Sequence, residues 1–162
     1  MVQPRCRITG GAGGDSIVLT ETVASSDEVV SVEGASVAPS ATSLAGATLA
    51  ADDTLTFANG VDVVTGFTAG ASGDIIDGVD AAAIPTTGIG VAAAAGFTGD
   101  TFFISGNYVA STGVFTVTAD GVGSDTLIVD AENNAATLAA TDDFILLVGV
   151  DSDDLVAANF TT

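Results

Sequence analysis

The chain has 162 residues, of which 48% are apolar and 20 are glycine, and its formal net charge at pH 7 is −19. Both of its basic residues, Arg5 and Arg7, lie within the first seven positions, and 21 carboxylates and no histidine accompany them. This charge repels the phosphate backbone, so we expect no nucleic-acid partner. The apolar share is typical of a globular chain, and no run of apolar residues is long enough to predict a transmembrane segment.

The same composition argues against catalysis. The sequence offers no His as a general base, no Lys as a Schiff-base nucleophile, and no Arg beyond residue 7 to hold a carboxylate or phosphate. We therefore expect that the protein is not an enzyme. Cys6 is the only cysteine, which excludes an intrachain disulfide, and any bound metal must be held by oxygen ligands. Ca²⁺ suits such ligands best, and it would relieve the repulsion among the carboxylates.

We expect residues 1–7 to be a disordered or non-native segment and residues 8–162 to form a single all-β module. A short pattern recurs along this module, in which a small residue or Asp precedes an Asp and then a run of β-forming residues. The small residue and the Asp suit a turn, and the β-branched or aromatic run suits a strand. Each copy therefore predicts a turn that leads into a strand. The copies lie at residues 14–19, 52–57, 73–76, 99–104, 124–129 and 142–147.

Between these copies, residues 61–67 and 113–118 also favour strands. The Ala-rich segments 36–51 and 81–95 predict loops or weakly packed structure, and residues 151–154 predict the cap of one helical turn. The expected fold class is all-β, with short Ala/Gly-rich loops and little helix. The pattern leaves a β-roll or β-solenoid and a β-sandwich open.

One motif points to a specific chemistry. Residues 10–18 match the nonapeptide G-G-x-G-x-D-x-U-x of calcium-binding repeats, and residues 59–65 form a degenerate copy whose Asp lies 47 positions later. Glycines allow a tight turn that presents backbone carbonyls, the Asp supplies a carboxylate, and the apolar residue anchors a short strand. A plain glycine turn is the alternative explanation of the same residues.

The sequence resembles the C-terminal region of RTX-type, type I secreted calcium-binding exoproteins, which include S-layer proteins and adhesins. The resemblance rests on the nonapeptide and on the order and spacing of residues 53–77, 113–130, 143–150 and 154–160. It implies that a parallel β-roll is closed by the C-terminal region and that the end of the chain is recognised by the type I secretion machinery. It also implies an extracellular or cell-surface location.

Candidate calcium ligands follow where the residues match. The resemblance implies backbone oxygens of Gly11 and Gly13 with the carboxylate of Asp15, and, in the degenerate copy, Asn59 and Asp62. Two further clusters of closely spaced oxygen ligands contain Asp120 with Asp125 and Asp151 with Asp153. Each of these clusters is open to a second interpretation as a solvated acidic turn.

We therefore expect a non-catalytic, calcium-binding structural module of a type I secreted bacterial cell-surface protein, similar to an S-layer protein or an adhesin. Such a chain would be exported unfolded and would fold where calcium is abundant, because metal binding adds to the folding free energy. One alternative is a subunit that self-associates into an extracellular filament or lattice. Another is the C-terminal secretion domain of an exoenzyme whose catalytic part lies outside this sequence.

Overall fold

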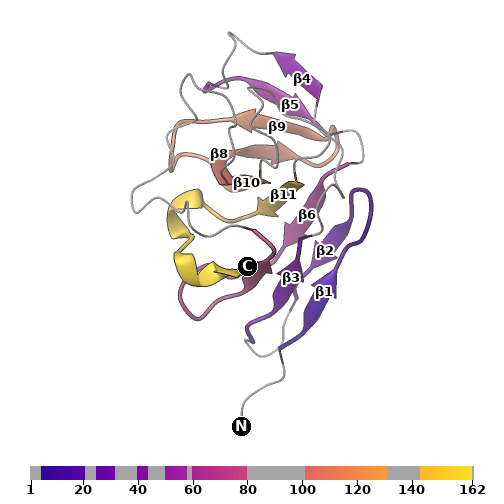
Figure 1. The fold of residues 1–162 in the computed structure, drawn as a ribbon. Helices are drawn as coiled ribbons and strands as arrows, with labels where there is room; N and C mark the ends of the chain where they lie inside the picture. The colour runs from indigo at the N-terminus through magenta and orange to yellow at the C-terminus, as the bar shows by residue number, and fades with distance from the viewer. Residues whose placement is uncertain are drawn as a thin grey trace.

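The structure of the protein is a computed structural model that describes residues 5–20, 25–31, 40–43, 50–57, 60–79, 101–130 and 143–161, with residues 40–43 described by their backbone. The described chain consists of short strands and two single turns of 3-10 helix (Figure 1). The prediction of an all-β fold is confirmed. The segment 81–95 and most of 36–51 lie outside the described residues.

The smaller sheet contains four very short strands that all run parallel. Their order is β1 (Arg7–Thr9), β3 (Glu28–Val30), β7 (Ile75–Asp77) and β12 (Phe160–Thr161). Across these strands, Ile8 pairs with Val29, Val29 with Ile76, and Ile76 with Phe160. The four apolar side chains therefore form one inward-facing column. Arg7 is the first residue of β1. The first strand therefore begins one residue before the module of residues 8–162 that the sequence predicts.

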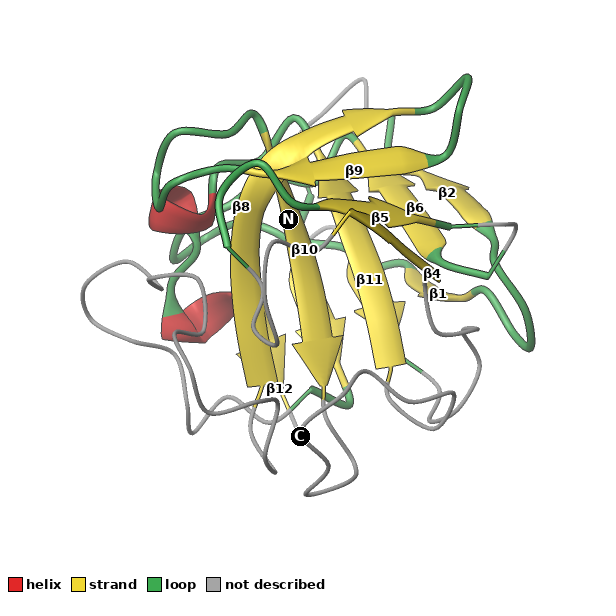
Figure 2. Cartoon of the chain, turned by 90° about the horizontal axis from the view of Figure 1, so that it is seen from above, coloured by secondary structure: helices red, strands yellow, loops and turns green. Residues whose placement is uncertain are grey.

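The larger sheet has eight strands in the order β2-β6-β11-β10-β8-β9-β5-β4. The first three, β2, β6 and β11, run parallel, and every later pair is antiparallel. The sheet curls so that β9 and β5 pass over β10 and β11 (Figure 2). The bounds are β2 Ser16–Val18, β4 Ser40–Ser43, β5 Thr54–Thr56, β6 Asp62–Thr65, β8 Thr101–Val109, β9 Val114–Val117, β10 Asp125–Asp130 and β11 Asp143–Val148.

The chain passes back and forth between the two sheets and so builds a stack of parallel strands. Ile17 pairs with Val64 across the larger sheet and Val29 with Ile76 across the smaller one, and both pairs are 47 residues apart. Strands β2 and β3 therefore form one layer of the stack and strands β6 and β7 the next, and the β4–β5 pair comes between these layers in the sequence. The larger sheet therefore belongs to this parallel stack at one side and continues as an antiparallel sheet at the other.

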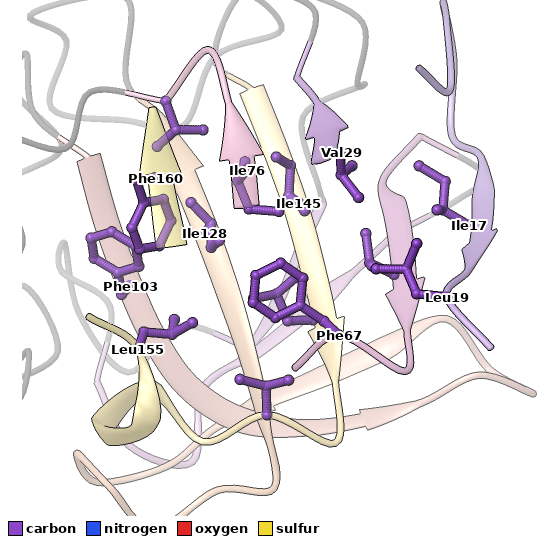
Figure 3. Close-up of a cluster of buried hydrophobic side chains, with 14 residues drawn as sticks. Ile17, Leu19, Val29, Phe67, Ile76, Phe103, Ile128, Ile145, Leu155 and Phe160 are labelled. Carbon is purple, nitrogen blue, oxygen red and sulfur yellow. The ribbon is translucent and has the colours of Figure 1, made fainter. Parts of the chain in front are cut away.

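Two apolar cores lie on opposite faces of the larger sheet. The first fills the space between the two sheets, where the rings of Phe103 and Phe160 meet edge to face at 5.1 Å (Figure 3). The second lies under the curled part of the larger sheet and includes Leu55, Phe115 and Phe144. Strands β10 and β11 contribute to both cores, which explains why their central residues are uninterrupted apolar runs.

The strands predicted between the copies of the acidic pattern agree with the structure. The segments 61–67 and 113–118 contain β6 and β9. The cap lies earlier than predicted: the carboxylate of Asp151 accepts a hydrogen bond of 3.1 Å from the Asp153 amide at the start of the 3-10 turn Ser152–Asp154, whereas the sequence places the capped turn at residues 155–158. A second 3-10 turn, Ala157–Asn159, leads into β12.

Candidate metal site

Three Asp carboxylates hold the turns of the parallel stack together. Asp62 Oδ1 accepts a hydrogen bond of 2.9 Å from the Asp15 amide, and Asp74 Oδ1 accepts one of 2.8 Å from the Asp27 amide. Asp27 Oδ1 in turn accepts a bond of 3.2 Å from the Cys6 amide. We call Asp27, Asp62 and Asp74 the aspartate ladder. Each of these carboxylates satisfies an amide of the preceding layer at the point where a strand begins.

The sequence pattern misses Asp27 as a member of this ladder. A signal for it exists, because Asp27 and Asp74 are separated by the same 47 residues as Asp15 and Asp62. Ser26 follows the same spacing, since its hydroxyl donates to the Gly73 carbonyl at 2.7 Å. The repeated offset therefore identifies residues that stack, even where the motif itself has degenerated.

Asp125, one of the predicted ligands, is engaged in the antiparallel part of the fold. Its two carboxylate oxygens accept hydrogen bonds from the amides of Gly149 and Tyr108, at 2.8 and 2.7 Å. The side chain is buried, so these amides depend on it for a partner. Asp125 therefore ties β10 to β8 and to the end of β11.

The glycine turn of the nonapeptide has the backbone shape that its sequence indicates. Gly11 and Gly13 have φ angles of 105° and 101°, a left-handed region that side chains rarely tolerate. Gly10 is required for a different reason, since a Cβ at this position would lie 2.9 Å from Asp15 Oδ2 and 3.2 Å from Asp62 Oδ2. The two carboxylates therefore converge on one small space beside Gly10.

Asp15 and Asp62 form an acidic pair without a matching cation. Asp15 Oδ2 is fully buried and has no hydrogen-bond partner among the described residues. Asp62 is 6% exposed, and its pKa is raised chiefly by burial and further by the charge of Asp15, against the lowering effect of the Asp15 amide. The basic side chains Arg5 and Arg7 bind Glu28 on the smaller sheet instead.

A hard cation fits this pair. The two carboxylates and the backbone carbonyls of the glycine turn are the kind of oxygen ligand that Ca²⁺ prefers. The buried Asp15 Oδ2, which has no hydrogen-bond partner among the described residues, is where a bound cation would supply the missing positive charge. In the part of the chain that the structure describes, no group of three or more His, Cys, Asp or Glu side chains is arranged to hold a metal. Backbone carbonyls and water would therefore complete the coordination. The fifth predicted ligand of this site, Asn59, lies outside the described residues.

A second acidic group forms where two distant loops meet. Burial raises the pKa of Asp120, and the charges of Asp153 and Asp151 raise it further. Asp120 Oδ1 is buried and has no hydrogen-bond partner among the described residues. The loop that carries Asp120 is held against β8, because the Gly121 amide donates to Ser105 Oγ at 3.0 Å. The structure thus brings Asp120, Asp151 and Asp153 together, whereas the sequence spacing groups Asp120 with Asp125.

Comparisons with models of protein families, with curated proteins and with solved structures found no match to this chain. Among the described residues, no helix has the length and apolar character needed to cross a membrane.

Proposed function

We propose that the protein is a non-catalytic, calcium-binding structural module of a type I secreted bacterial cell-surface protein, similar to an S-layer protein or an adhesin. The observation that carries this proposal is the buried, unpartnered Asp15 Oδ2 beside the buried Asp62 at the glycine turn. A Ca²⁺ ion at this point would neutralise the pair and join two layers of the parallel stack. The second acidic group, Asp120 with Asp151 and Asp153, does not have the arrangement of a three-carboxylate metal site, so the proposal rests on the glycine turn.

The proposal gives calcium a direct role in stability. A cation that binds the folded chain but not the unfolded chain raises the free energy of unfolding by about 1.4 kcal/mol when its concentration is about ten times its dissociation constant. Calcium sites of extracellular modules bind at about 10⁻⁴ to 10⁻³ M. Millimolar calcium outside the cell would therefore stabilise the module, and the low calcium of the cytoplasm would leave it less stable before export.

The test compares Asp15→Asn with Asp52→Asn, which removes the same charge from an exposed turn residue. Thermal unfolding of each variant is followed by circular dichroism in chelator, in calcium and in magnesium. We expect calcium to raise the unfolding midpoint of the parent chain and of Asp52→Asn, and to have little effect on Asp15→Asn. A chelated parent chain that is fully folded and indifferent to calcium would contradict the proposal.

Terbium luminescence locates the ion more directly. Tyr108 is the only tyrosine, the chain has no tryptophan, and Tyr108 lines the same groove as Asp15. Excitation of Tyr108 should therefore sensitise a Tb³⁺ ion bound beside Asp15, and calcium should displace it. Loss of the signal in Asp15→Asn, with retention in Asp52→Asn, would assign the ion to the glycine turn.

One observation favours self-association as a second candidate function. β1 and β2 are the outermost strands of the two sheets at the same end of the stack, and no described strand pairs with their outer edges. Such edges are templates for pairing with another chain. Arg5 and Arg7 lie at this end, so the repulsion between two acidic copies is weakest there.

Sedimentation of the parent chain and of Thr9→Lys/Val18→Lys tests this candidate. Thr9 and Val18 are exposed on the two edge strands, so the variant adds charge without entering the core. We expect the parent to form dimers or larger assemblies at high concentration and the variant to remain monomeric. A monomeric parent in both calcium and chelator would exclude assembly through these edges.

A further inference from the structure

A groove of about 450 Å³ lies between the glycine turn and the turn that joins β8 to β9. The nonapeptide contributes Asp15 and Ser16 to one side, and Ser111 and Thr112 contribute to the other. The volume is within the usual range of small-molecule sites. Among the expected functional residues that the structure describes, Asp15 lines this groove.

The floor of the groove is apolar and firmly held. Phe57 and Val61 line it and are buried members of the second core, with exposures of 5% each. Tyr108 also lines it, is half-buried, and is fixed by the hydrogen bond of its amide to Asp125 at 2.7 Å. Tyr108 and Val63 are half-buried and so supply the accessible aromatic and aliphatic surface of the floor. This surface rests on the buried Phe57 and Val61.

The rim carries groups that bond to hydroxyls. The hydroxyl side chains of Ser16, Ser111 and Thr112 are exposed, and Asp15 presents a half-buried carboxylate. No basic side chain lines the groove, because Arg5 and Arg7 are bound on the smaller sheet. An anionic ligand is therefore disfavoured by the net charge of −19. The matching ligand has an apolar face and several hydroxyl groups that can both donate and accept.

We propose that this groove binds a neutral saccharide unit. The C–H face of a pyranose ring would lie on the apolar floor, and its hydroxyls would bond to the carboxylate of Asp15 and to the hydroxyls of the rim. The floor and the rim do not depend on a bound cation, so the inference goes beyond the calcium proposal. If an ion occupies the glycine turn, it would add a ligand for the hydroxyls of the sugar.

The experiment uses the full chain and three probes, the methyl glycosides of glucose, galactose and N-acetylglucosamine. Binding is measured by saturation-transfer NMR and by the emission of Tyr108, which is the only tyrosine in a chain without tryptophan. Each titration is run in calcium and in chelator. Ser111→Arg fills the exposed rim of the groove, and Val122→Arg adds the same charge at a loop position that is 69% exposed and outside the lining.

We expect at least one glycoside to bind saturably and to change the emission of Tyr108. Ser111→Arg should weaken that binding about tenfold or more, whereas Val122→Arg should leave it within about twofold. Three outcomes would overturn the inference: no glycoside binds in either condition, both variants weaken binding equally, or a simple amine such as ethylamine binds and the glycosides do not. Failure in both conditions, with the calcium-dependent rise in midpoint intact, would reject the saccharide site and leave the calcium proposal standing.

Discussion

Strands β2 and β6 at one side of the larger sheet run parallel and have three and four residues, whereas β8 and β10 in its antiparallel part have nine and six. The short parallel strands present alternate residues to one core, and carboxylates satisfy the amides at their turns. The longer strands are buried on both faces. The parallel stack therefore relies on carboxylates to satisfy backbone amides at its turns, whereas the longer strands contribute apolar residues to both cores.

This difference predicts which part of the molecule responds to its surroundings. The raised pKa of Asp62 marks an ionised state that burial makes unfavourable. Protonation, calcium or a conservative substitution should change the stability of the parallel stack. The apolar core beneath β9 and β5 should be indifferent to all three.

The largest effect is expected from truncation of the second core. Phe144 on β11 is fully buried, and its ring meets that of Phe57 edge to face at 6.4 Å. Phe144→Ala should lower the free energy of unfolding by about 3–5 kcal/mol, measured by urea denaturation in both calcium and chelator. Val18→Ala, at a position 57% exposed, should change it by no more than about 0.5 kcal/mol. If the loss of unfolding free energy in Phe144→Ala depended on calcium, the two parts of the molecule would not differ in their response to the ion.

A smaller but still substantial loss is expected when the aspartate ladder is cut. Asp74 is 2% exposed, and it accepts hydrogen bonds from the amides of Asp27 and Thr68 at 2.8 and 2.7 Å. Asp74→Ala leaves both amides without this partner, so the free energy of unfolding should fall by about 2–4 kcal/mol. Asp74→Asn keeps one acceptor oxygen and should recover part of the loss. Equal stability of the alanine variant and the parent would show that the ladder contributes nothing.

The smallest effect is expected from pH. Because the pKa of Asp62 is raised above its ordinary value of 3.8, the folded chain binds more protons than the unfolded chain above that pH. The contribution of Asp62 to stability is therefore complete below pH 3.8 and is lost as the pH rises through the folded pKa. The same sign holds for Asp120, whose pKa is raised mainly by burial and then by Asp153 and Asp151. Asp77 has the opposite sign, because its hydrogen bond to Arg7 lowers its pKa.

Unfolding midpoints of the parent and of Asp62→Asn, measured in chelator from about pH 4 to about pH 7, isolate the effect of Asp62. The parent should lose stability relative to the variant as the pH rises, because burial disfavours the ionised form of Asp62. Calcium should remove this difference, because a bound cation favours the ionised form. If the parent and the variant have parallel profiles in chelator, Asp62 does not titrate in this range.

The strands that follow an acidic turn are predictable from the sequence because their signal is local. Asp53 precedes β5 and Asp74 precedes β7, each followed directly by β-forming residues. The stacking of Asp15 on Asp62 is also visible in advance, as a motif and its degenerate copy. By contrast, no small residue and Asp precede β1, and its parallel pairing with β3 joins residues 21 positions apart.

The environment of each carboxylate was decided by the fold. Asp120 and Asp125 are close in the sequence, yet Asp125 is satisfied by amides from two other segments, while Asp120 meets Asp151 and Asp153 from the end of the chain. The groove has the same origin, since the nonapeptide and the turn after β8 are adjacent only in the folded protein.

The sequence by itself determined the all-β class, the excess of carboxylates over basic groups, and the glycine turn with its acidic residue. These follow from local backbone preferences and from composition, which do not depend on distant contacts. The tertiary structure alone decided which carboxylates serve as hydrogen-bond acceptors and which are left as buried, uncompensated charge. Burial and partners depend on how segments far apart in the chain pack together, and no local pattern contains that information.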